Sequence, residues 1–87
     1  MHDKIENSNL NKFHDQIKLI MKLFGIININ SISDHVTLEF CWNNVKNKNS
    51  KTFLKKVSKF EIDYQVKLDP SLKIVDVAEQ MYNYRPF

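Results

Sequence analysis

The chain has 87 residues, of which 43% are hydrophobic and ten are aromatic, with a single glycine and two prolines. A chain of this length forms one domain, 1–87, and its apolar content excludes a disordered or low-complexity protein. Thirteen basic residues against ten acidic residues give a net charge of +3. This small excess favours solubility and by itself specifies no class of partner.

Cys41 is the only cysteine, so the chain alone forms neither a disulfide nor a thiolate metal cluster. Such cysteine usage is typical of a reducing compartment. No apolar run reaches the roughly 18 to 20 residues of a membrane-spanning helix, and the N-terminus lacks the apolar core of a secretory signal. The sequence therefore predicts a soluble, intracellular protein without a membrane segment.

The first predicted element is a helix over residues 8–24. Ser8 or Asn9 can cap its start with a side-chain oxygen, and Gly25 supplies a stop just past its end. Apolar residues recur at spacings of three and four, which places them in one stripe. That stripe fits a helix packed on its own sheet and also the end of a coiled coil with a partner helix. Its members are Leu10, Phe13, Ile17, Ile20, Met21 and Phe24.

A sheet is predicted next, because residue types alternate with a period of two over residues 35–42. A short β-branched stretch, 26–30, would form a strand before it. The period places Phe40 toward the core and Cys41 on the opposite, more polar face as a buried or half-buried structural cysteine. One face would carry Val36, Leu38, Phe40 and Trp42, and the other Thr37, Glu39 and Cys41.

The second half of the chain is predicted to complete the sheet and close with a helix. Residues 43–51 are polar and form a loop, while 52–59 fit both helical and strand spacing. We favour a strand there, because eight residues are short for a helix and 60–66 alternate cleanly. Pro70 ends the sheet, and a last helix covers 76–82. The expected fold class is α+β: an N-terminal helix, a three- to four-stranded antiparallel sheet and a C-terminal helix.

Candidate catalytic and cofactor-binding groups are few, and the sequence predicts neither an enzyme nor a cofactor. The only glycine, Gly25, cannot build a phosphate-binding loop. Cys41 with His35 has no orienting third residue, and Glu61 with Asp63 is typical of solvated acids on a sheet face. Three histidines are too scattered for a metal site: His2, His14 and His35.

A lysine-rich stretch is the one feature that favours nucleic acid. Six lysines and no acid occur between residues 43 and 60, interleaved with Phe53 and Phe60. Lysines release counterions from phosphates, and aromatic rings stack on bases. The alternative is a solvated surface without function. The candidate basic patch consists of Lys46, Lys48, Lys51, Lys55, Lys56 and Lys59.

Several short motifs between residues 22 and 72 resemble one known family. They are Lys-Leu-Phe-Gly-Ile at 22–26, the aromatic-rich stretch 36–45, Asp-Tyr-Gln-Val at 63–66 and Asp-Pro-Ser-Leu at 69–72. Together they resemble the RWD-type globular heads of kinetochore proteins, most closely the Spc25-type head of the Ndc80 complex. The related Spc24 and monopolin Csm1-type heads fit these motifs as well. Family members carry a longer coiled coil before the head and a final helix that continues further, so residues 8–24 match only the last part of such a coiled coil.

The resemblance implies a non-catalytic subunit for chromosome segregation in cell division. Such a module would sit at the kinetochore in the nucleus and link centromere-bound and microtubule-bound complexes. It would form a hetero-oligomer with a Spc24-like subunit through a helix and head interface. The helix seam that would meet this partner consists of Leu10, Phe13 and Ile17. The alternative function is a small basic nucleic-acid-binding protein that uses the segment 46–59.

Overall fold

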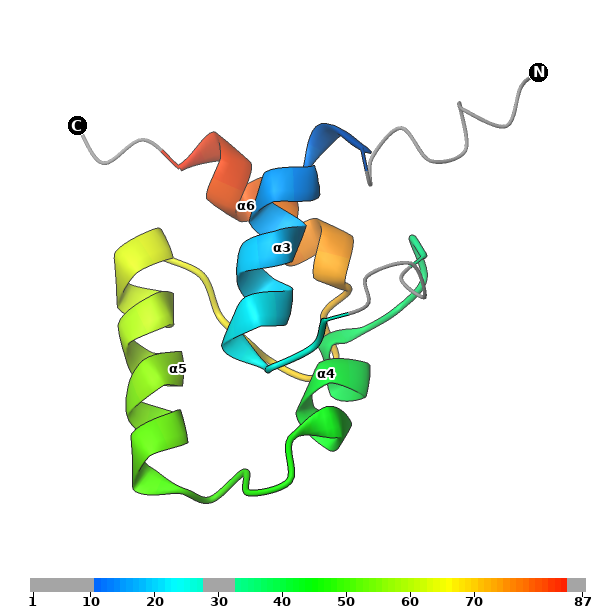
Figure 1. The fold of residues 1–87 in the computed structure, drawn as a ribbon. Helices are drawn as coiled ribbons and strands as arrows, with labels where there is room; N and C mark the ends of the chain where they lie inside the picture. Colours follow the sequence, from blue (N-terminus) through cyan, green and yellow to red (C-terminus); the bar gives the residue numbers. More distant parts are fainter. Residues whose placement is uncertain (1–10, 28–32, 85–87) are drawn as a thin grey trace.

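The computed structural model describes residues 11–27 and 33–84, and within these ranges the chain is built from helices (Figure 1). The only strand-like pairing among them is an isolated bridge between Thr37 and Lys73. The predicted α+β domain with an RWD-like antiparallel sheet is therefore wrong, and the described part of the chain is all-α. Its helices are α3 (His14–Leu23), α4 (Leu38–Asn44), α5 (Lys51–Tyr64) and α6 (Ile74–Asn83).

The helix predicted over 8–24 is confirmed from His14 to Leu23, and Phe13 forms a turn before it. Gly25 ends it with φ at 75°, a conformation that glycine adopts without strain. The amide of Gly25 donates to the carbonyl of Lys22, and the amide of Ile26 donates to that of Met21. This pair of bonds closes the helix end in the Schellman pattern. The apolar stripe of α3 faces the core of the same chain, with Phe13, Ile17, Ile20, Met21 and Phe24 all buried.

The predicted strand over 35–42 is instead helix α4 with the turn that precedes it. Phe40, expected in the core, is 43% exposed, whereas Cys41 is fully buried. The reason is a second period within the same residues. Apolar side chains also recur at i, i+3, i+4 and i+7, which gather on one side of a helix. These are Leu38, Cys41, Trp42 and Val45, all buried or packed against the core.

Backbone contacts with the segment before α6 hold the start of α4, which has no side-chain cap. The amide of Leu38 donates to the carbonyl of Leu72 at 2.8 Å, and the amide of Glu39 donates to that of Pro70 at 3.0 Å. The first amides of a helix have no partner within the helix. The loop before α6 thus supplies the acceptors for the first amides of α4. The start of this short helix therefore depends on a tertiary contact and has no local sequence signal.

The two strands predicted over 52–59 and 60–66 are one helix, α5. Its start is capped by Ser50, whose hydroxyl accepts from the amide of Phe53. Helix α5 spans 14 residues, so the objection that eight residues are short for a helix disappears. The side chains of α5 that are buried or half-buried against the core follow helical spacing: Phe53, Val57, Phe60 and Tyr64. Gln65 ends α5 in the left-handed conformation, with φ at 54°.

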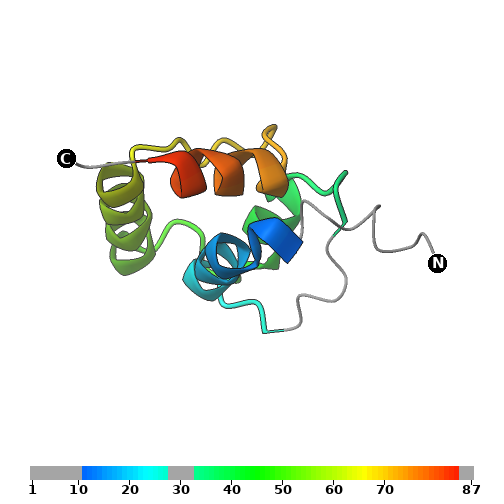
Figure 2. The ribbon, with the colours of Figure 1, turned by 90° about the horizontal axis from the view of Figure 1, so that it is seen from above.

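The predicted C-terminal helix is confirmed as α6, which packs against α3. Figure 2 shows α6 lying next to α3, which is seen nearly end-on when the molecule is viewed from above. The rings of Phe13 and Tyr82 meet edge to face across this contact, 5.2 Å apart. Most of α6 is buried: Ile74, Val75, Val77, Ala78 and Met81. The helix pair α3–α6 is therefore the centre of the fold.

The loop between α5 and α6 links the remaining helices to that centre. Val66 and Leu68 are buried, whereas Lys67 between them is exposed. The amide of Leu68 donates to a carboxylate oxygen of Glu61 at 2.8 Å, and its carbonyl accepts from the indole N–H of Trp42 at 3.0 Å. This loop thus fixes α5 relative to α4. Of the predicted first strand 26–30, Ile26 and Ile27 lie outside any strand and 28–30 fall outside the described residues.

Candidate functional site

The predicted lysine patch lies on α5 and in the turn before it, and all six lysines are exposed. Within α5, Lys51, Lys55 and Lys59 recur every four residues and form a stripe along one side of the helix. Lys56 lies beside this stripe, toward α3. Lys46 and Lys48 belong to the preceding turn. Three of the six lysines thus lie in one stripe of α5, and the other three lie beside it or in the turn before it.

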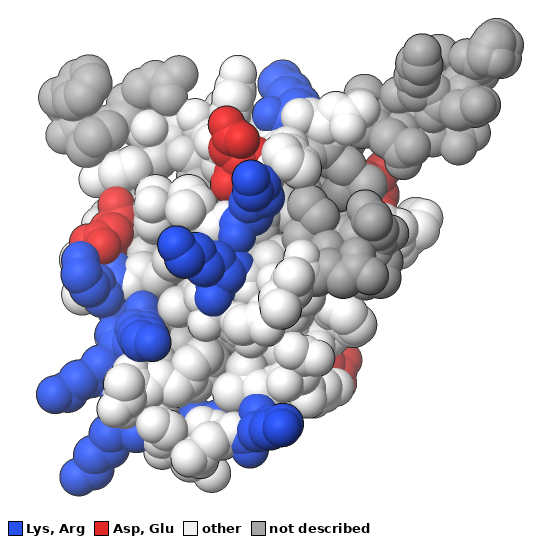
Figure 3. Space-filling view, in the orientation of Figure 1, with Lys and Arg blue, Asp and Glu red and all other residues white. Residues whose placement is uncertain are grey.

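Helix α3 carries two further exposed lysines, Lys18 and Lys22, which the sequence reasoning did not include. They are four residues apart and therefore lie on the same side of α3. Lys22 borders the same groove as Lys56 and Lys59 of α5. We call the six residues Lys18, Lys22, Lys51, Lys55, Lys56 and Lys59 the basic surface. In Figure 3 the blue side chains gather over α5 and α3, with few red ones between them.

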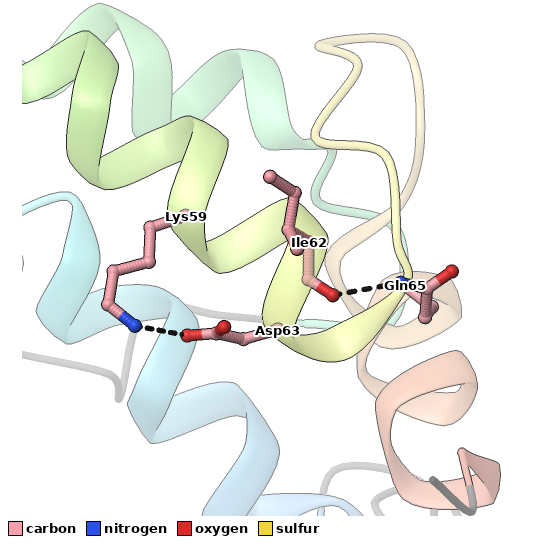
Figure 4. A network of polar contacts seen from close by, with 4 residues as sticks. All are labelled: Lys59, Ile62, Asp63 and Gln65. Atoms are coloured by element: carbon pink, nitrogen blue, oxygen red, sulfur yellow. Dashed lines mark hydrogen bonds and ion pairs between the residues drawn. The ribbon is translucent and has the colours of Figure 1, made fainter.

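Three acids stand on these two helices: Asp15 of α3, which borders the same hollow as Lys18 and Lys22, and Glu61 and Asp63 of α5. Asp63 pairs with Lys59 at 2.8 Å, one helical turn away (Figure 4). The hydrogen bond from Lys59 and the attraction of the carboxylate raise the pKa of Lys59. Both side chains are well exposed, so the pair contributes little to stability. Glu61 is engaged elsewhere, because it accepts from the amide of Leu68.

Between α3 and α5 lies a groove of about 270 Å³, which we call the α3–α5 groove. The rings of Phe60 and Tyr64 stack obliquely on its α5 side, with centroids 4.7 Å apart. Leu19 and Leu23 of α3 border it from the other side, and Leu19 is 39% exposed. Lys22, Lys56 and Lys59 stand around it, together with Asp63. Apolar surface and basic rim thus occur at one place.

The two aromatic residues predicted to accompany the lysines have different environments. Phe60 borders the α3–α5 groove. Phe53 instead faces the interior, where its ring meets those of Phe24 and Trp42 edge to face at 5.8 Å and 5.6 Å. Phe53 therefore stabilises the fold and is not placed to meet a ligand. Tyr64, not singled out in the sequence, lies in the groove because it follows Phe60 by one turn.

The predicted partner seam lies inside the fold where it is described. Phe13 is 4% exposed and Ile17 is 3% exposed, and both belong to the core. Leu10 lies outside the described residues. Within this structure Phe13 and Ile17 pack on their own chain, so they offer no free surface to a partner helix.

The residues weighed as catalytic candidates do not form a reactive group. Cys41 is fully buried, and burial raises its pKa to about 12, so the thiol stays protonated at neutral pH. His35 is exposed on the turn before α4. Asp63 is paired with Lys59, as described above. Among the described residues no three His, Cys, Asp or Glu side chains come together as metal ligands.

A second hollow, of about 620 Å³, lies beside the end of α3, bordered by Asp15, Lys18 and Lys22 of that helix and by Gly25, Ile26 and Ile27. We place no site there, because its wall ends at Ile27 and residues 28–32 lie outside the described ranges.

None of the helices described in 11–27 and 33–84 is long and apolar enough to cross a membrane. No protein-family model, curated protein or solved structure matches the chain significantly.

Proposed function

We propose that this chain is a non-catalytic binding module that uses the basic surface to bind nucleic acid. The observation that carries the proposal is the concentration of charge. Six exposed lysines stand on two neighbouring helices, and in the described chain only one of them forms an ion pair. Such a cluster attracts a polyanion and releases the counterions condensed on its phosphates.

The distribution of charge along the chain supports the same function. Six of the 13 basic residues lie between residues 43 and 60, where no acid occurs, and four of these six belong to the basic surface. The other seven basic residues are outnumbered by the ten acids, so the rest of the chain is net acidic. The excess charge of the molecule is thus local. A local excess orients the protein on a polyanion, whereas a uniform one affects mainly solubility.

The kinetochore function stays a prediction based on sequence resemblance. It relied on an RWD-like sheet, whereas the described residues form helices. It also relied on the helix seam, of which Phe13 and Ile17 are buried in the fold. A Spc24-like partner, hetero-oligomerisation and a nuclear location depend on that resemblance. No feature of the described surface favours them over nucleic acid.

The direct test is binding of the intact chain to a labelled 12-nucleotide single strand at a series of salt concentrations. Each phosphate contact contributes about −0.7 to the slope of log K against log salt for single strands. If at least three lysines engage phosphates, the expected slope is about −2 or steeper. Absence of salt-sensitive binding at low ionic strength would contradict the proposal.

A further inference from the structure

We infer that the α3–α5 groove accepts an unpaired base of a single-stranded nucleic acid. This inference rests on the proposed function and specifies its ligand further. It predicts that the chain distinguishes a strand with bases from the same sugar-phosphate chain without them. The basic surface alone would bind both equally.

The groove combines the two features that single-strand binding requires. Phe60 and Tyr64 supply aromatic surface, and both side chains are half-buried, so part of each ring remains accessible. Lys22, Lys56 and Lys59 are exposed around the same hollow. Proteins that bind single strands pair a positively charged track with rings on which bases stack. A base in the groove would leave its phosphates among these lysines.

The size of the groove favours a base over a longer apolar ligand. Its volume of about 270 Å³ lies just below the roughly 300 to 1,000 Å³ of pockets that hold drug-sized molecules. An acidic amphipathic helix would require anchors over several turns. Double-stranded nucleic acid keeps its base faces stacked inside the duplex and therefore has no planar surface to offer. A single base between Leu19 and the two rings fits both the size and the chemistry.

The experiment compares three ligands of the intact chain at fixed salt: oligo(dA) of 12 nucleotides, an abasic strand of equal length and poly-glutamate. We expect oligo(dA) to bind roughly tenfold more tightly than the abasic strand, since stacking on an aromatic residue adds about that factor per base. Phe60→Leu should reduce this preference while keeping an apolar side chain. Phe40→Leu is the matched control, because Phe40 is an exposed aromatic residue on α4.

The outcomes separate the two proposals. Equal, salt-sensitive binding of oligo(dA) and the abasic strand overturns the base-binding groove and leaves the proposed function intact. Binding of neither strand overturns both. Poly-glutamate binding as tightly as oligo(dA) replaces nucleic acid with an acidic protein partner. The comparison of ligands on the parent chain decides the inference even if Phe60→Leu fails to fold, which circular dichroism would reveal.

Discussion

Ile20→Ala is expected to lower the free energy of unfolding by about 2 to 5 kcal/mol, the cost of truncating a large aliphatic side chain in a packed core. Ile20 is fully buried in α3, the helix that packs against α6. A domain of this size has a total stability of only about 5 to 15 kcal/mol, so the variant should melt at a much lower temperature. Thermal unfolding followed by circular dichroism measures the loss.

Phe40→Ala is the matched control for Ile20→Ala. A strand over 35–42 would make Phe40 a core residue with a cost of roughly 3 to 5 kcal/mol. Because Phe40 is 43% exposed on α4, the expected loss is below about 1 kcal/mol. A larger loss for Phe40→Ala than for Ile20→Ala would contradict the all-α arrangement and favour the sheet.

The second large effect concerns binding. The variant Lys22→Gln/Lys51→Gln/Lys55→Gln/Lys56→Gln should reduce the slope of log K against log salt by up to about 3, because each lost phosphate contact removes about 0.7 for a single strand. At low salt the affinity for a 12-nucleotide strand should fall at least about tenfold. All four lysines are exposed, so the change in stability should stay within about 0.5 kcal/mol. Fluorescence anisotropy measures the binding.

Lys67→Gln/Lys73→Gln supplies the control for net charge. Both lysines are exposed, but they lie between α5 and α6 and not on the basic surface. If binding depends on position, this control retains most of the affinity. A loss in proportion to the number of lysines removed, wherever they lie, would mean that the protein binds through its overall charge.

Sequence reasoning predicted the first and last helices correctly because their stop and start signals are local. Gly25 adopts the left-handed conformation that ends α3, and Asp76 lies in the first turn of α6. The apolar stripe of α3 was predicted either to pack on its own chain or to pair with a partner helix. In the described chain its buried members pack on their own chain. Leu10 lies outside the described residues.

The middle of the chain was assigned wrongly because two periods coexist in it. Residues 36–42 alternate as in a strand, while Leu38, Cys41, Trp42 and Val45 also fit a helix. The choice depends on tertiary contacts: carbonyls of the loop at 70–72 accept from the first amides of α4. Residues 52–66 were treated as two short strands, so the single helix α5 was not predicted. Its cap was a local signal, because Ser50 is a residue type that caps helices well.

The lysines of α5 could be predicted from composition alone, but the site could not. Lys22 and Leu19 join it only because α3 lies beside α5, and Tyr64 joins it because it follows Phe60 by one turn of α5. The one local signal was the spacing of Lys18 and Lys22, which places both on the polar side of the first helix. Phe53 was wrongly expected beside the lysines, because a predicted strand does not show which aromatic side chains of a helix face the interior.

Both proposals require that nucleic acid binds across α3 and α5. Amide resonances of the ¹⁵N-labelled chain, recorded while a 12-nucleotide single strand is added, test it most directly. We expect the largest shifts on residues 18–23 and 51–64, with little change in α6. Shifts centred on α6 or α4, or none at a strand concentration that saturates binding, would contradict it.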